Sequence, residues 1–178
     1  MVHCSPQAVW KKVPKICSNK QADKETILIL QSPTNDLSNL KKVDENKRKL
    51  LAEKSSTEIL RIVKDALAEF SLKQVIILGR PRRADDTDLE NLSKISNAFL
   101  EKLIKRESNR IVYGDNSVHY NVIERDLFGE FGDGIHLRGK AGKKIYTDQH
   151  LAALKKGAKS LEYKVFTLKT LLSFVSNI

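Results

Sequence analysis

Val75-Ile76-Ile77-Leu78 (VIIL), followed directly by Gly79-Arg80-Pro81, is the stretch that most clearly decides the fold. Four consecutive apolar residues before a turn-forming cluster predict a short buried strand. Two further runs of this kind, Thr26–Gln31 (TILILQ) and Arg110–Tyr113 (RIVY), also end in turn-forming residues. We therefore expect three strands, with Val75–Leu78 in the middle along the chain.

Apolar residues at helical spacing lie between these strands. The first stripe comprises Ile59, Ile62, Val63, Ala66, Leu67 and Phe70, and the second comprises Leu89, Leu92, Ile95, Phe99 and Leu103. Ser55, Ser56 or Thr57 is expected to cap the first helix, and Lys41–Lys54 before it is expected to be a solvated loop or a helix start. Acidic residues at Asp85–Asp88 suit the positive end of the second helix.

The rest of the chain completes an alternation of strands and helices. Val118–Phe131 is predicted to be irregular, and Gly139–Gly157 is predicted to be a final helix. Strands that alternate with helices of this length indicate a parallel sheet wrapped by helices, which is a three-layer α/β/α fold.

The length and composition indicate one globular domain. The chain has 178 residues, 40% of them hydrophobic and 30% charged, and a net charge of +10. We place the domain at residues 1–160 and a C-terminal extension at 161–178. The basic excess suits either an ordinary solvated surface or a surface that binds nucleic acid or an anionic membrane.

Cysteine and histidine usage predicts neither a metal site nor a cofactor. Cys4 and Cys17 are too few for a disulfide scaffold, and we interpret them as free thiols in a reducing compartment. His3, His119 and His150 lack the partner spacing of a metal site. The N-terminus lacks the apolar segment of a signal peptide, and no apolar run is long enough to span a membrane, so a cytoplasmic protein is expected.

Asp133-Gly134-Ile135-His136 is the clearest chemical motif. An aspartate can hold the tautomer of a nearby imidazole and stabilise its imidazolium form, so that His136 can serve as a general base. Asn35, just after the first strand, can donate a side-chain N–H to an oxyanion, which is typically worth about 3 kcal/mol. Both are expected at the carboxyl ends of the strands, where ligands bind in such sheets.

These motifs resemble the SGNH (GDSL-type) hydrolase superfamily. Pro33-Thr34-Asn35-Asp36 resembles its third block, Gly-x-Asn-Asp, and Asp133–His136 resembles its fifth, Asp-x-x-His. Cys4-Ser5-Pro6-Gln7-Ala8 resembles the second block, so that the resemblance covers roughly residues 3 to 157. It implies a flavodoxin-like architecture and hydrolysis of acyl or acetyl esters. His136 would be the base, Asp133 its orienting partner and Asn35 the oxyanion donor.

The nucleophile of this family has no counterpart that we can identify. In the family, the nucleophilic serine follows the first strand, in a Gly-Asp-Ser block upstream of the second block. This chain has almost no residues before its second block. Gln7 and Pro33 also replace the glycines of the second and third blocks. Ser5, Ser32 and Ser117 are alternatives, but none fits a nucleophile-elbow pattern. We therefore expect the first strand to be missing. We expect the chain to be either a pseudoenzyme or a truncated product, and a longer form that includes the first strand to be active.

A non-catalytic module of retrotransposon-related origin, which binds nucleic acid or another protein, is the alternative hypothesis. SGNH-like domains also occur in proteins of some retrotransposons, beside segments that bind nucleic acid. Residues 138 to 164 fit that role with Arg138, Lys140, Lys143, Lys144, Lys155, Lys156, Lys159 and Lys164 against Asp148 and Glu162. Arg80, Arg82 and Arg83 are interpreted as solvated loop charge, or else as ligands for a substrate carboxylate or phosphate. The substrate and the oligomeric state stay open.

Overall fold

The fold is described from a computed structural model. The structure describes residues 13, 17–18, 24–32, 34–38, 40, 43–115, 117–122, 124–129, 134 and 139–160. For residues 35–36, 117–118, 124–125, 139–141 and 158–160 it describes the backbone alone.

The described residues form a parallel sheet of three strands, β1 (Ile27–Gln31), β2 (Gln74–Leu78) and β3 (Ile111–Gly114), in the spatial order β1-β2-β3. Ile29 of β1 pairs with Ile76 of β2, which pairs with Val112 of β3. Every residue of β2 is buried. The prediction of a buried strand at Val75–Leu78 is thus confirmed, and it is the central strand of the described sheet.

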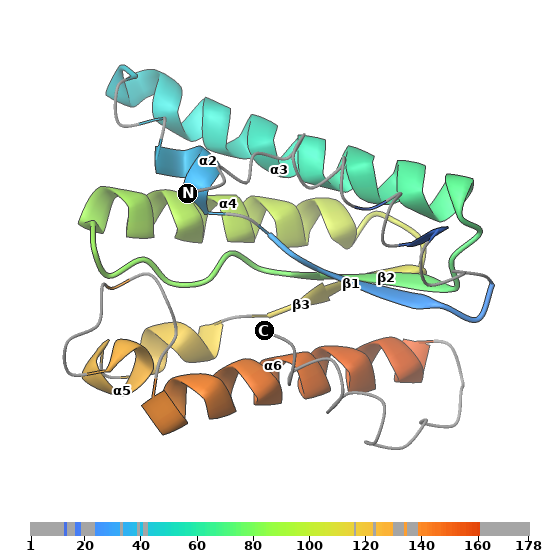
Figure 1. The fold of residues 1–178 in the computed structure, drawn as a ribbon. Helices are drawn as coiled ribbons and strands as arrows, with labels where there is room; N and C mark the ends of the chain where they lie inside the picture. Colours follow the sequence, from blue (N-terminus) through green and yellow to red (C-terminus); the bar gives the residue numbers. More distant parts are fainter. Residues whose placement is uncertain are drawn as a thin grey trace.

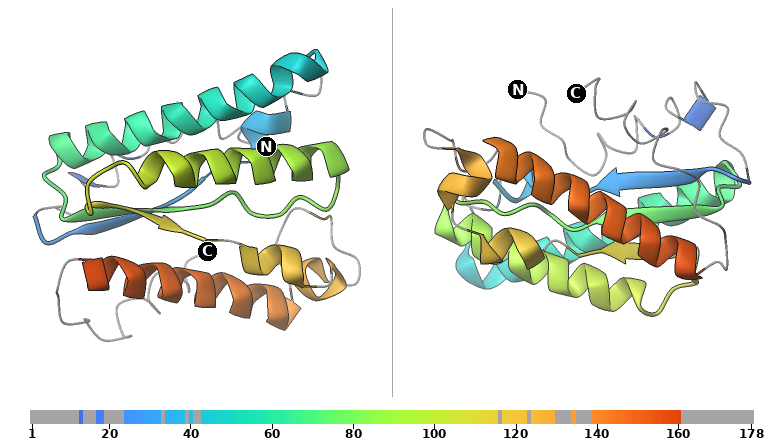
Figure 2. Two further views of the ribbon diagram at one scale, coloured as in Figure 1. Left: turned by 180° about the vertical axis from the view of Figure 1, so that it is seen from behind. Right: turned by 90° about the horizontal axis from the view of Figure 1, so that it is seen from below.

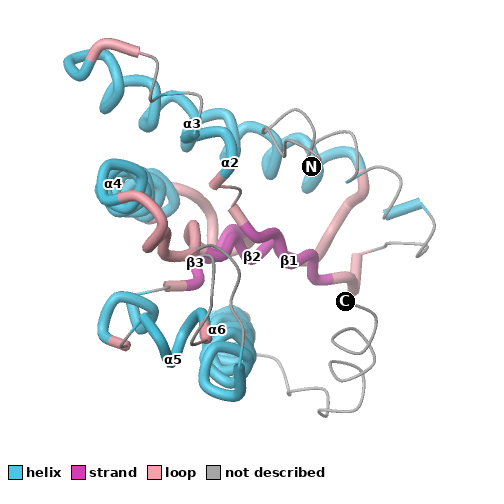
Figure 3. The backbone as a smooth tube through the Cα atoms, turned by 60° about the vertical axis from the view of Figure 1, so that its left-hand side comes forward, coloured by secondary structure: helices cyan, strands magenta, loops and turns pink. Residues whose placement is uncertain are grey.

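Helices cover both faces of this sheet, as Figures 1 and 3 show. The helices α3 (Glu45–Glu69) and α4 (Thr87–Ile104) lie together on one face, and α5 (Glu124–Phe128) and α6 (Gly139–Ser160) cover the other. Two successive crossovers of the same hand put α3 and α4 on one face, because the strands advance in one direction across the sheet. The predicted α/β fold with a parallel sheet between helical layers is therefore confirmed.

Alternate residues of β2 contribute to two separate cores. Val75 and Ile77 pack with Val63 of α3 and Leu100 of α4, whereas Ile76 packs on the other face in a cluster that includes Ala153 of α6. This division follows from the period of two of a strand, whose successive side chains point to opposite faces. Each fully buried Val or Ile contributes about 1.5–3 kcal/mol relative to exposure.

The first long helix begins well before the predicted cap. Asp44 is the N-cap of α3, and its side chain accepts a hydrogen bond from the Asn46 N–H at 3.0 Å. The predicted cap at Ser55–Thr57 is therefore wrong. Ser56 is buried inside the helix, and its hydroxyl donates to the Ala52 carbonyl at 3.2 Å, as a serine in the middle of a helix often does.

Two smaller features complete the described fold. The segment predicted to be irregular contains the 3₁₀ helix η2 (Ser117–Asn121) and the short helix α5, so that prediction is wrong in part. Leu127 and Phe128 of α5 are buried, and α5 packs against α6. Among the described helices, none is long and apolar enough to cross a membrane.

Candidate functional site at the carboxyl edge of the sheet

Hydrogen bonds just beyond the strands keep the carboxyl ends of β1, β2 and β3 aligned. The Ser32 N–H donates to the Leu78 carbonyl at 3.0 Å, and the Gly79 N–H donates to the Gly114 carbonyl at 3.0 Å. The segments that follow the strands therefore start from one common edge. In open parallel sheets this edge is where ligands bind.

Asn35 begins α2 (Asn35–Ser38), the short helix that follows β1. The Leu37 N–H donates to the Thr34 carbonyl at 3.1 Å, and Leu37 is buried against Ala52 of α3 and Leu89 of α4. These contacts fix the backbone on which Asn35 lies. The side chain of Asn35 is outside the described residues, so its role as an oxyanion donor stays a prediction.

Gly134 connects the Asp-x-x-His motif to the loop after β2. Its carbonyl accepts a hydrogen bond from the Ala84 N–H at 2.8 Å. Its φ is +68°, and a Cβ there would lie 2.5 Å from the Asp85 nitrogen, so only glycine fits without strain. Asp133 and His136, on either side, lie outside the described residues.

Arg80, in the loop after β2, is fully buried between the two long helices. Its Nε donates to Ser96 Oγ at 2.8 Å and its Nη2 donates to Ser55 Oγ at 2.7 Å. Its backbone is fixed as well, since its N–H donates to Asn97 Oδ1 at 2.7 Å and its carbonyl accepts from Asn97 Nδ2 at 3.0 Å. The interpretation of Arg80 as solvated loop charge is therefore wrong, because the guanidinium links α3 to α4.

Arg82 and Arg83 are also held by the protein. Arg83 is almost fully buried and donates two hydrogen bonds of 2.6 Å to the carboxylate of Asp85. Arg82 donates to Glu90 at 3.4 Å and to the Val122 carbonyl at 3.1 Å. The interpretation as solvated charge is wrong for this pair too. Charge-assisted bonds of this kind order the loop on which Gly134 packs.

None of the described contacts places a general base beside the three serines considered as nucleophiles. Ser32 is buried after β1, and its Oγ has no hydrogen-bond partner in the described part of the chain. Ser117 begins η2, with a side chain that is not described, and Ser5 lies outside the described residues. The nucleophile therefore remains unidentified.

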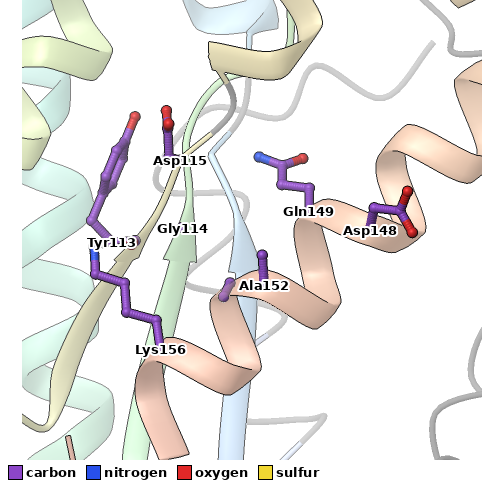
Figure 4. Close-up of a pocket in the computed structure, with 8 residues that line it drawn as sticks. Tyr113, Gly114, Asp115, Asp148, Gln149, Ala152 and Lys156 are labelled. Carbon is purple, nitrogen blue, oxygen red and sulfur yellow. Dashed lines mark hydrogen bonds between the residues drawn. The ribbon is translucent and has the colours of Figure 1, made fainter. Parts of the chain in front are cut away.

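A polar cluster that sequence reasoning missed lies at the end of β3. His119 of η2 and Gln149 of α6 are buried, at 1% and 4% exposure, and lie against each other near Asp115. Burial lowers the pKa of His119 to about 4, which leaves the imidazole uncharged at neutral pH. Gln149 and Asp115 also line a pocket of about 330 Å³ (Figure 4). The spacing from Asp115 to His119 was the available signal, but it has no specific meaning without a fold.

The described residues offer no metal site, since no group of three or more His, Cys, Asp or Glu side chains comes together among them. Cys17 is a buried free thiol, as predicted. Burial raises the pKa of this thiol, and the negative charge of Glu69 raises it further. A thiol of this kind is inert at neutral pH. Cys4 lies outside the described residues.

Comparisons of this chain with protein-family models, with curated proteins and with solved structures found no match.

Proposed function

We propose that the chain is an SGNH-hydrolase-like domain derived from an ester hydrolase acting on acyl or acetyl esters. The observation that supports this proposal is the hydrogen bond from the Ala84 N–H to the Gly134 carbonyl, which holds the second residue of the Asp-x-x-His motif against the loop after β2. Asn35 begins the helix after the adjacent strand, β1. The order β1-β2-β3, with α6 on the face opposite α3 and α4, also suits a flavodoxin-like sheet.

In this proposal, each motif residue has one role. His136 takes the proton of an attacking hydroxyl, Asp133 holds the imidazole tautomer, and Asn35 donates a hydrogen bond to the developing oxyanion. No serine has been matched to the nucleophile. We therefore propose that the chain is catalytically incomplete, with at most the slow rate that binding and an oxyanion donor provide.

Hydrolysis of 4-nitrophenyl acetate tests whether a hidden nucleophile exists. The purified chain is compared with His136→Ala and with the control His150→Gln, which removes an imidazole from α6. An incomplete site predicts that all three hydrolyse the ester at nearly the same low rate. A wild-type rate that only His136→Ala abolishes would contradict incompleteness while supporting the esterase assignment, and Ser5, Ser32 and Ser117 would then be substituted in turn.

A nucleic-acid-binding module is the second candidate, and the charge of α6 favours it. The helix carries six lysines against one acidic residue, Asp148. Lys143, Lys144, Lys155 and Lys156 are exposed, although Lys144 pairs with Asp148 at 2.5 Å and Lys156 donates to the Tyr113 carbonyl at 3.1 Å. A phosphate backbone bound by such lysines releases counterions. Affinity for single-stranded RNA that falls steeply with salt supports this candidate, and no binding at low salt contradicts it.

A further inference from the structure

The strand β1 lies at the edge of the described sheet, yet its composition is typical of an interior strand. Figure 3 shows the three strands in a row with β1 at one end. The residues Ile27–Leu30 are all isoleucine or leucine, and the strand contains neither a charged residue nor a proline. Edge strands in natural proteins are usually protected by charges, prolines or bulges, whereas continuous apolar runs are typical of the interior of parallel sheets. The composition of β1 therefore indicates a further partner at its outer side.

The backbone of β1 has hydrogen-bonding groups on that outer side. Just after the strand, the Ser32 N–H donates to the Leu78 carbonyl of β2 at 3.0 Å. Since the N–H and C=O groups of successive residues in a strand point alternately to its two sides, the even-numbered residues of β1 face β2. The same groups of the odd-numbered residues, Ile27, Ile29 and Gln31, therefore face outward. Among the described residues, no strand pairs with that side of β1.

A segment of matching length and composition follows α6. This helix ends at Ser160, and Val165–Lys169 (VFTLK) comes after a connection of four residues, outside the described part of the chain. Valine, phenylalanine and threonine favour strands, and the segment is as long as β1, which has five residues. Connections of about 2–6 residues between a helix and a strand are common in α/β folds. The chain can therefore continue from α6 into a further strand.

The hand of the crossovers selects the edge at β1 and excludes the edge at β3. The helices α3 and α4 connect strands that advance from β1 to β3 along one face of the sheet. The helix α6 lies on the other face, so a right-handed crossover from β3 through α6 must return in the opposite direction, toward β1. A parallel strand beyond β3 that is reached through α6 would need a left-handed crossover, which occurs in only about 2% of cases.

The connection is long enough to reach the outer side of β1. In the last turn of α6, the Gly157 carbonyl accepts a hydrogen bond at 3.4 Å from Nε2 of Gln74, the first residue of β2. The helix therefore ends at the amino end of the sheet, where a parallel strand must begin. A strand outside β1 lies two strand spacings from β2, or about 10 Å. The four residues between Ser160 and Val165 span about 16 Å when extended, which leaves length for the step from the helix to the sheet.

We propose that Val165–Lys169 docks on the outer side of β1 as a fourth, parallel strand of the same chain. The chain order of the strands then reverses beside β1, and in open α/β sheets ligands bind at the carboxyl ends of the strands at such a reversal. The segment thus completes the edge of the sheet at which Asn35 begins α2, and residues 161–178 include a strand of the domain. The proposal needs neither Asp133 nor His136, so it stands or falls separately from the ester hydrolase assignment.

Amide hydrogen exchange, followed by NMR on the full chain, tests this strand. In the wild type, the outward amides of Ile29 and Gln31 are expected to exchange about as slowly as that of Leu30, which faces β2. The double variant Phe166→Pro with Thr167→Pro removes two successive N–H groups, one of which must face β1 in either register. This variant should accelerate exchange at Ile29 and Gln31 by about a hundredfold or more and leave Leu30 slow. The control Ser176→Pro with Asn177→Pro, later in the same tail, should leave all three amides slow.

Three results would overturn the proposal. The amides of Ile29 and Gln31 could exchange freely in the wild type, both double variants could leave them slow, or their protection could appear only as the protein concentration rises. The second result would assign the outer side of β1 to another segment, and the third would assign it to a second copy of the chain. If the variant with Phe166→Pro fails to fold, nuclear Overhauser contacts in the wild type between the Ile29 amide and the α-protons of Val165–Lys169 decide instead, and their absence overturns the proposal.

Discussion

His119 makes the stability of the folded chain depend on pH. Burial lowers its pKa from 6.5 to about 4, against a smaller raising effect from Gln149 and Asp115, and His150 lowers it further. Between these pH values the unfolded chain binds a proton that the folded chain does not. The contribution of His119 is therefore complete above pH 6.5 and is lost as the pH falls toward 4.

We predict that the free energy of unfolding falls by about 3 kcal/mol over this pH window, at 1.36 kcal/mol per pKa unit. His119→Gln should remove most of that slope. His150→Gln should keep most of it, because His150 is only partly buried and its Nδ1 is 2.7 Å from the Tyr146 carbonyl oxygen. Urea denaturation at intervals between pH 4.5 and 7 measures these slopes. Equal slopes in the wild type and His119→Gln would contradict the buried, neutral histidine.

The roles of some single residues could not be predicted from the sequence. The need for glycine at position 134 arises from the backbone of Ala84 and Asp85, about fifty residues away in the chain, and no local pattern reveals such a contact. Arg80 is similar, since its type predicts exposure, whereas in the fold its guanidinium is buried and donates to Ser96 and Ser55. The motif Asp133–His136 could be found from sequence, whereas the polar pair His119 and Gln149 needed the fold.

At the scale of elements, the strands were predictable and the buried faces of the helices were less so. The stripe predicted for α4 includes Ile95 and Phe99, which are only half buried, while Ser93, Ser96 and Asn97 are buried. The face is rotated toward polar residues because Ser96 and Asn97 bond to Arg80. Apolar periodicity cannot predict the buried face of a helix when polar residues on that face bind a buried arginine.

Charge reversal on α6 distinguishes nucleic-acid binding by this helix from a general effect of the net positive charge. Reversing charge in the double variant Lys143→Glu with Lys155→Glu should weaken single-stranded RNA binding at least tenfold and flatten its salt dependence. The control Lys47→Glu with Lys102→Glu changes the net charge equally on the exposed surfaces of α3 and α4. Filter binding at two salt concentrations measures both. Equal losses would assign the effect to net charge and remove α6 as a binding face.

At the scale of the whole molecule, the fold class follows from sequence and the assignment of function depends on one convergence. Alternating strands and helices suffice for a parallel sheet between two helical layers. The loop after β2 carries the backbone contact to Gly134, and α2 follows the neighbouring strand. We propose that, from this arrangement, Asp133 and His136 form a hydrogen-bonded pair at the carboxyl edge of the sheet.

The tautomer of His136, read from long-range ¹H–¹⁵N NMR correlations at pH 8, tests that claim most directly. Spectra of the full chain and of Asp133→Ala are compared, with His136→Ala to assign the signals. If Asp133 accepts a hydrogen bond from Nδ1–H, the wild type should hold the Nδ1–H tautomer and Asp133→Ala should return toward a mixture. The same tautomer mixture in both chains would contradict the pair, and with it the SGNH-like site.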